Sequence, residues 1–207
     1  MLARIAMALV LGVFAVAVSA TPVRVVNLSA EPRQAVTDCR GHMEILDLIG
    51  KTEGTDRGRG YNETLAYGAF TNGQVNLVAL TLNEIDVLQT RMLAHPQNSF
   101  NSSAVGRYQI VRSTMRSLRR ELGLTGNELF DAPMQDMLAK ALLDRRGYHK
   151  WANGLISDVQ FQANLSFEWA SLTNPATGRG SYKGQNGRIK LSVQQSSLDR
   201  ARCQLTD

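Results

Sequence analysis

The sequence is poor in the residue patterns that hold metals or activate nucleophiles. Its three histidines, His42, His95 and His149, form no H-x-x-x-H pair, and the spacing of its two cysteines fits no metal site. No G-x-S-x-G is present, although a Ser–His–Asp triad assembled from distant residues stays open. We therefore expect no metal and no other cofactor.

Signatures of phosphate and nucleic-acid binding are also missing. The glycine-rich run at 178–184 lacks the G-x-x-x-x-G-K-S/T pattern of a P-loop, and no helical pattern follows it. A net charge of +5 is small for a nucleic-acid-binding domain, so we expect no nucleic-acid partner. A mildly basic protein still suits an anionic partner, such as an envelope surface.

The first 20 residues show the pattern of a secretory signal peptide. A short basic start ends at Arg4, an uncharged apolar stretch runs from Ile5 to Val18, and Ala20 closes a small-residue cleavage site. The apolar stretch is shorter than the roughly 20 residues that span a bilayer. We expect cleavage and a periplasmic or secreted protein. The alternative is a retained segment that tethers the protein to a membrane.

The two cysteines, Cys39 and Cys203, lie near the two ends of the part that would remain after cleavage. An even cysteine count in an exported protein favours a disulfide between them. A bridge that closes so long a loop stabilises a fold by roughly 5 kcal/mol at most. The alternative is two free buried thiols in a cytosolic protein, which the signal-peptide pattern makes the weaker interpretation.

We divide the chain into a signal segment (1–20), a tether (21–38) and one compact domain (39–207). The domain is expected to be mostly helical α+β, because helical patterns are separated by one glycine-rich segment, 54–73. Its interleaved tyrosines and phenylalanine predict turns and short strands, and thus a small β-hairpin lobe. Helices are predicted over 40–53, after Thr81 to before Pro96, over 111–122, from Asp131 to before Gly147, from Ser157 to Leu172, and weakly over 190–204.

Glu53 lies where the first predicted helix meets the glycine-rich segment. The apolar residues of that helix, Ile45 to Ile49, place Glu53 beside the core, and Gly54 follows at once. Burial raises the pKa of a carboxyl group and makes it a usable general acid near neutral pH. The alternative is an inert, solvated glutamate at a helix end.

Three segments together resemble a known family. Leu46–Asp56, Gly60–Asn62 and Ala104–Ile110 occur in an order that resembles the phage lambda endolysin group of the lysozyme superfamily. The segments Glu121–Leu124 and Glu168–Leu172 follow in the order that this group has. Ala104–Ile110 also looks like the G-x-M-Q-I element of the Slt-type lytic transglycosylases.

The resemblance implies a lysozyme-like fold, with a cleft between a helical lobe and a small β-hairpin lobe, and a monomeric enzyme. Glu53 would be the catalytic acid that protonates the MurNAc–GlcNAc oxygen of peptidoglycan glycan strands. Structural alternatives are hairpin core for Tyr61 and Tyr67 and a helix cap for Ser103. The expected substrate-binding residues are Tyr61, Asn62, Tyr67, Ser103, Tyr108, Gln109, Tyr182 and Gln185.

The second carboxylate of a hydrolase is missing from its usual place. The phage T4-type lysozymes keep an aspartate and a threonine where this chain has Asn62 and Gly68. Asp56 lies nearby but is expected to be solvated in a turn. Glu63 lies one residue away from the position of the missing carboxylate. One carboxylate favours a lytic transglycosylase that makes 1,6-anhydroMurNAc, with Glu53 as acid and then base. The alternatives are a hydrolytic muramidase and a non-catalytic wall-binding component of an envelope assembly.

Overall fold

Helix α1 (Gly41–Glu53) is the element that the other helices surround in the computed structural model, which describes residues 41–181 and 187–202. Ile45, Leu46 and Ile49 of α1 are completely buried. All described residues lie in one compact unit, Val36–Asp207. The predicted signal segment, the tether, Cys39 and Cys203 lie outside the described residues, so those interpretations stay predictions.

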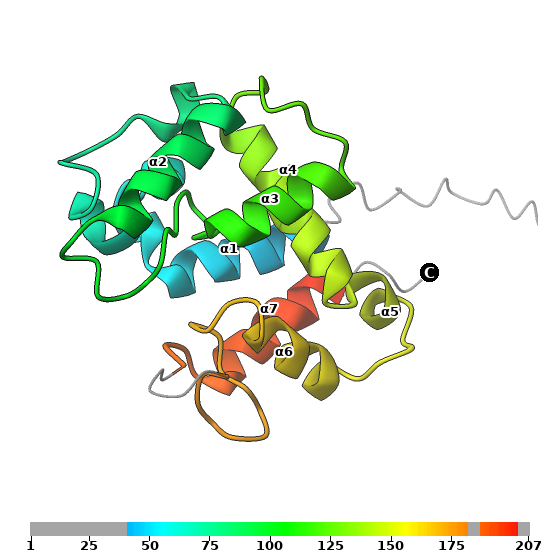
Figure 1. Ribbon diagram of the computed structural model, residues 1–207. Coiled ribbons are helices and arrows are strands. Elements are labelled where there is room, and N and C mark those ends of the chain that lie inside the picture. Colours follow the sequence, from blue (N-terminus) through cyan, green and yellow to red (C-terminus); the bar gives the residue numbers. More distant parts are fainter. Residues whose placement is uncertain (1–40, 182–186, 203–207) are drawn as a thin grey trace, which may run out of the picture. The chain divides into compact units, whose positions relative to one another are not determined.

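The mostly helical character of the domain is confirmed. In Figure 1, α2 and α3 lie on one side of α1, α6 and α7 lie on the other, and α4 runs from the first group to the second. None of the helices in the described ranges is long and apolar enough to cross a membrane. The helices after α1 are α2 (Leu82–Ala94), α3 (Arg112–Glu121), α4 (Ala132–Arg145), α5 (Tyr148–Ala152), α6 (Asp158–Ser166) and α7 (Leu191–Arg202).

Side-chain caps begin three of these helices, as the sequence predicts. At α2, the Thr81 hydroxyl accepts from the Glu84 amide (3.3 Å) and Glu84 accepts from the Thr81 amide (2.7 Å), a complete capping box. Asp131 accepts from the Met134 amide at α4 (2.9 Å). Ser157 caps α6 in the same way. Because these caps are local, the sequence alone locates the helix starts.

The helices differ from the prediction in two places. Helix α6 ends at Ser166 rather than at Leu172, and the residues after it form turns that still bury Trp169 and Leu172. Burial explains the apolar spacing there without a continuous helix. The short helix α5 was not predicted; it buries Tyr148 and Trp151.

The predicted β-hairpin lobe is not formed by the described residues. Segment 55–79 instead winds through four short 3₁₀ turns: η1 (Thr55–Arg57), η2 (Gly60–Asn62), η3 (Leu65–Gly68) and η4 (Leu77–Ala79). Three of its glycines and three other residues have positive φ, so the backbone reverses too often for an extended strand. Only isolated antiparallel bridges remain in this region, Thr64 to Val105 and Val105 to Ile110.

The tight turn between Val105 and Ile110 brings the segment 104–110 against the 3₁₀ region. The Gly106 amide donates to the Glu63 carbonyl (2.7 Å), and the Leu65 amide donates to the Ala104 carbonyl (3.0 Å).

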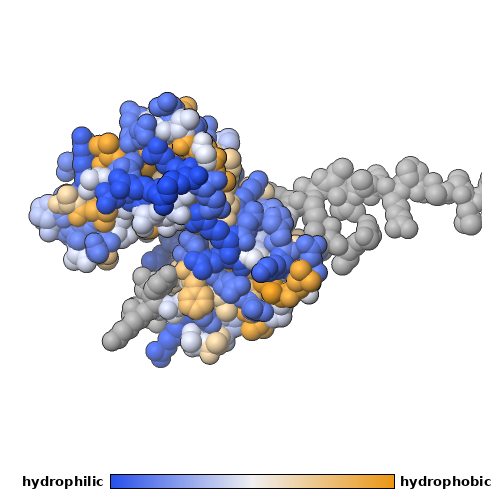
Figure 2. All heavy atoms as spheres, turned by 45° about the vertical axis from the view of Figure 1, so that its right-hand side comes forward, coloured by the Kyte–Doolittle hydropathy of each residue, from blue (hydrophilic) through white to orange (hydrophobic). Residues whose placement is uncertain are grey.

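Most of the surface in Figure 2 is hydrophilic, with isolated apolar patches.

We predict that Gly106→Ala destabilises the fold by about 2–3 kcal/mol. Gly106 has a φ of 78°, and a Cβ there would lie 2.3 Å from Gln135 Oε1. Gly60→Ala is the matched control, because Gly60 also has positive φ (56°) but has open space around it. Backbone strain alone predicts a loss of about 1 kcal/mol for the control. Urea unfolding measures both, and equal losses would contradict the packing argument.

Candidate active site

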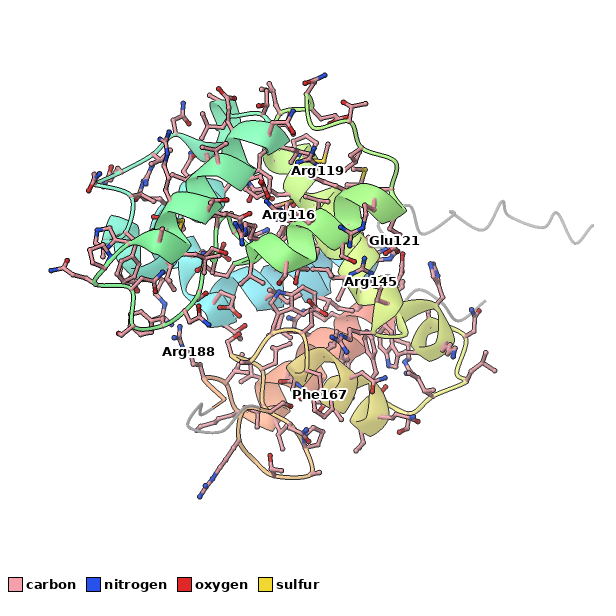
Figure 3. The ribbon with its side chains drawn as sticks, viewed as in Figure 1. Arg116, Arg119, Glu121, Arg145, Phe167 and Arg188 are labelled. Atoms are coloured by element: carbon pink, nitrogen blue, oxygen red, sulfur yellow. The ribbon has the colours of Figure 1, made fainter. Side chains whose placement is uncertain are left out.

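Glu53 is the last residue of α1 and is half-buried. Gly54, with a φ of 82°, turns the chain out of the helix immediately after it. The Ser171 hydroxyl donates to Glu53 Oε1 (2.7 Å). Arg188 Nη1 donates to the Glu53 backbone carbonyl (3.2 Å). Figure 3 shows the Arg188 side chain reaching from the segment before α7 towards α1.

The pKa of the Glu53 carboxyl is raised, because burial disfavours its charged form. The hydrogen bond from Ser171 and the positive charge of Arg188 both favour the carboxylate and offset part of this effect. A carboxyl group with a raised pKa keeps its proton closer to neutral pH, as a general acid requires. The alternative of a fully solvated glutamate is therefore wrong.

Ser171 connects Glu53 to a short chain of hydroxyl groups. Its hydroxyl also lies 3.1 Å from Thr52 Oγ1, which in turn donates to the Ile49 carbonyl. Oε2 of Glu53 forms no hydrogen bond with any residue in the ranges 41–181 and 187–202. Oε1 is thus held by Ser171, and no described residue holds Oε2.

Arg107 joins two of the three segments on which the family resemblance rests, Leu46–Asp56 and Ala104–Ile110. Its guanidinium binds both carboxylate oxygens of Asp56 (2.8 and 3.0 Å) and one oxygen of Asp47 (2.9 Å). The Thr55 hydroxyl donates to the Arg107 carbonyl (2.7 Å). Asp56 is exposed in a turn, as expected, and its carboxylate also holds the turn after Glu53 against segment 104–110.

Tyr61 and Tyr108 share a partner behind this turn. Both hydroxyl groups donate to Asp136 Oδ1 (2.8 and 2.5 Å), and the Arg107 guanidinium lies about 5.5 Å from each ring centroid. Tyr108 is 1% exposed, so in this structure it supports the site from within the core. Tyr61 is half-buried and packs against the core.

Asn62 and Ser103 also have internal partners. The Asn62 side-chain carbonyl accepts from the Val78 amide (3.0 Å) and joins η2 to η4. The buried Ser103 hydroxyl accepts from the amide of Arg112, the first residue of α3 (3.0 Å). This contact is of the kind that the helix-capping alternative for Ser103 predicts.

Tyr67 and Gln109 are the predicted substrate-binding residues with the most freedom to meet a ligand. Tyr67 is 78% exposed, so its hairpin-core alternative is wrong. Gln109 is half-buried with a φ of 50°, and its side-chain amide donates to the Gly106 carbonyl (2.9 Å). Tyr182 and Gln185 lie outside the described residues, so their predicted roles remain predictions.

An open pocket of about 300 Å³, here called the Glu53 pocket, borders the end of α1. It includes the two chain neighbours of Glu53. The described residues that line it are Lys51, Thr52, Gly54, Arg57, Tyr67, Arg188 and Ile189.

The arginines of α3 are largely engaged with neighbouring side chains. Arg116 binds both carboxylate oxygens of Asp86 (2.6 Å each), and Arg119 donates to Asn83 (2.8 Å). Figure 3 shows Arg116 and Arg119 between α2 and α3. These contacts weaken the case for an anionic surface partner on this face. In the described part of the chain, no three or more His, Cys, Asp or Glu residues cluster as metal ligands would.

Two residues that contact Glu53 were not identified from the sequence. Ser171 lies within Glu168–Leu172, a segment quoted only as part of the resemblance, and the spacing gives no sign of its bond to Glu53. Arg188 follows a glycine-rich run that shows no signal for the site. Both contacts span more than a hundred residues of chain, so only the fold reveals them.

Comparison with known proteins gives one match. The sequence model of a protein family described as Endolysin matches residues 43–194, from the start of α1 into α7. A search of curated proteins and a search of solved structures each found no match.

We predict that Ser171→Ala raises the pKa of Glu53 further. The variant loses a donor that favours the carboxylate, while burial is unchanged. Carbon-13 NMR of the Glu53 carboxyl would show its titration moving to higher pH. Ser196→Ala is the control, since Ser196 lies exposed on α7 and bonds only within that helix. A titration that stays in place, or moves to lower pH, would contradict the role given to Ser171.

We predict that Arg107→Met lowers the free energy of unfolding by about 2 kcal/mol, because it leaves Asp47 and Asp56 without their shared partner. The Arg107 side chain is only 12% exposed. Arg91→Met, on the exposed face of α2, is the control and should change stability by less than about 0.5 kcal/mol. Equal stabilities of the two variants in urea would show that the ion pairs do not hold the site together.

Proposed function

The chain belongs to the endolysin family and is thus a peptidoglycan-cleaving glycosidase, and we propose that it acts as a lytic transglycosylase through Glu53. The observation that carries the proposal is a single half-buried carboxyl group whose pKa is raised by burial. The carboxylates nearest to it in sequence are all occupied by other partners.

In the proposed reaction, Glu53 gives its proton to the glycosidic oxygen between MurNAc and GlcNAc, and the bond from C1 to that oxygen breaks. The Glu53 carboxylate then takes the proton of the MurNAc C6 hydroxyl while the C6 oxygen bonds to C1. The products are a free GlcNAc end and 1,6-anhydroMurNAc, and Glu53 is again protonated. Because the nucleophile is part of the substrate, its effective concentration replaces a second carboxylate and a water.

The state of the neighbouring carboxylates supports one-acid chemistry. A two-carboxylate hydrolase needs a free second group facing the sugar. Asp47 and Asp56 bind Arg107. Glu63 is 4% exposed, and its two oxygens accept from the amides of Arg59 (3.1 Å) and Thr64 (3.0 Å).

The contact with Ser171 suits a residue that serves as acid and then as base. When Glu53 is ionised, the Ser171 hydroxyl donates to it. When Glu53 carries its proton on Oε2, the Ser171 hydroxyl can still donate to Oε1. Both protonation states therefore keep a hydrogen bond on Oε1, and neither leaves a buried polar atom unsatisfied.

Hydrolysis is the second candidate. The side-chain carbonyl of Asn62 is bound to Val78, but its amide nitrogen has no partner among the described residues and can hold a water. A water positioned there would attack C1 in place of the C6 hydroxyl and leave a reducing end. A third candidate, a non-catalytic wall-binding component, keeps the fold and needs no acid.

Peptidoglycan lies outside the cytoplasmic membrane. We therefore propose that the chain acts after export, in the periplasm or outside the cell, as its N-terminal pattern predicts. The membrane tether is the alternative for the same segment.

We predict that Glu53→Gln lowers the release of muropeptides from purified sacculi by about 100-fold or more, because it removes the general acid. The pKa of Glu53 is raised by folding, so this carboxyl favours the fold below its unfolded pKa and loses that contribution as pH rises through its folded pKa. The neutral variant should consequently be at least as stable as the parent protein at pH 7, and its melting temperature controls for unfolding.

The mass of the released muropeptides separates the mechanisms in the same experiment. Transglycosylation gives anhydro ends, which are lighter by one water than reducing ends. Reducing ends from the parent protein would overturn the proposed mechanism and favour hydrolysis. Undiminished release by Glu53→Gln would exclude Glu53 as the acid in either mechanism.

A further inference from the structure

The Glu53 pocket is positively charged. Its described lining includes Lys51, Arg57 and Arg188, and no carboxylate. Lys51 and Arg57 are exposed and form no ion pair with a carboxylate of residues 41–181 or 187–202. Asp56, the acid next to Arg57 in the chain, is bound to Arg107 instead. Lys51 and Arg57 are thus available to an anionic ligand, and Arg188 adds a third positive charge while it donates to the Glu53 carbonyl.

The size of the pocket fits a short chain segment better than a single ion. Its volume of about 300 Å³ is at the lower end of the range for ligand pockets. A water molecule occupies only about 30 Å³ of liquid volume, so a lone carboxylate would leave most of the pocket unfilled.

Tyr67 adds a flat, exposed ring to the cations. It and Ala66 both have left-handed backbone conformations, with φ of 58° and 53°. Two consecutive non-glycine residues of this kind are strained, and such strain gathers at ligand-binding sites. A ring that is 78% exposed at a pocket wall is the surface on which an apolar part of a ligand would lie.

Peptidoglycan carries its negative charges on one side of each disaccharide. GlcNAc is neutral, whereas MurNAc bears a lactyl group, and the peptide stem attached to it has free carboxylates. A pocket of three cations beside the acid that protonates the MurNAc glycosidic oxygen would lie within reach of that stem. The placement rests on the proposed role of Glu53.

We propose that the Glu53 pocket binds a carboxylate of the MurNAc peptide stem, so that the enzyme cleaves peptide-bearing strands in preference to bare glycan. Lys51, Arg57 and Arg188 supply charge-assisted hydrogen bonds to the carboxylate, and Tyr67 packs against the stem. Substrate choice then depends on the peptide as well as on the sugar.

The test compares three soluble substrates: uncrosslinked glycan strands with their peptide stems, the same strands with the stem carboxylates amidated, and strands stripped by an amidase. We expect kcat/KM on the first to exceed that on the other two by about tenfold, the value of one charged hydrogen bond. The preference should decline as salt is raised, because the pocket is open to solvent.

The variant Lys51→Gln/Arg57→Gln should bring the three substrates close to equal, mainly by raising KM on the peptide-bearing strands. Arg120→Gln removes one charge from the exposed face of α3 and should leave the preference unchanged. If the double variant melts at a lower temperature than the parent, each single substitution should still lower the preference on its own.

Equal cleavage of all three substrates by the parent protein would overturn the proposal. Amidase cleavage frees the lactyl carboxylate of MurNAc, so efficient cleavage of the stripped strands alone would assign the pocket to that group and also overturn the proposal. The readout is a ratio between substrates, so it does not depend on whether the ends are anhydro or reducing. Failure of the proposed mechanism and failure of the pocket proposal are therefore seen separately.

Discussion

The ion pairs of Arg107 are the interaction on which the site depends. One guanidinium holds Asp47 of α1 and Asp56 of η1, while the backbone of Arg107 accepts from Thr55 and donates to Gln135 of α4. These bonds fix the chain just after Glu53, in a 3₁₀ region that has only isolated bridges and no paired strands. The Arg107 guanidinium, 12% exposed, thus joins α1 to the 3₁₀ region that stands where the sequence predicts a β-hairpin lobe.

At Glu53, the proposed role as a general acid and the stability of the folded protein make opposite demands. Burial that raises the pKa of this carboxyl also makes its ionised form costly to the folded protein near neutral pH. Ser171 and Arg188 reduce that cost without removing it, because both favour the carboxylate. A raised pKa that is partly offset in this way suits the proposed role of Glu53 as a general acid.

The positively charged side chains around Glu53 have two different roles. On one side, Arg107 is neutralised by aspartates and fixes the backbone. On the other, Lys51 and Arg57 face solvent beside the pocket with no such partner among the described residues. The difference separates a structural cation from cations suited to a ligand.

From the sequence alone, most of the helices and the candidate acid Glu53 can be predicted. Caps at Thr81, Asp131 and Ser157 act over three residues, so they can be recognised without a fold, and the endolysin-like segments pointed to Glu53. The 3₁₀ turns of the glycine-rich segment and the contact of Ser171 with Glu53 are seen only in the folded protein. Those outcomes depend on contacts between residues far apart in the chain, and no local pattern encodes the geometry that such contacts require.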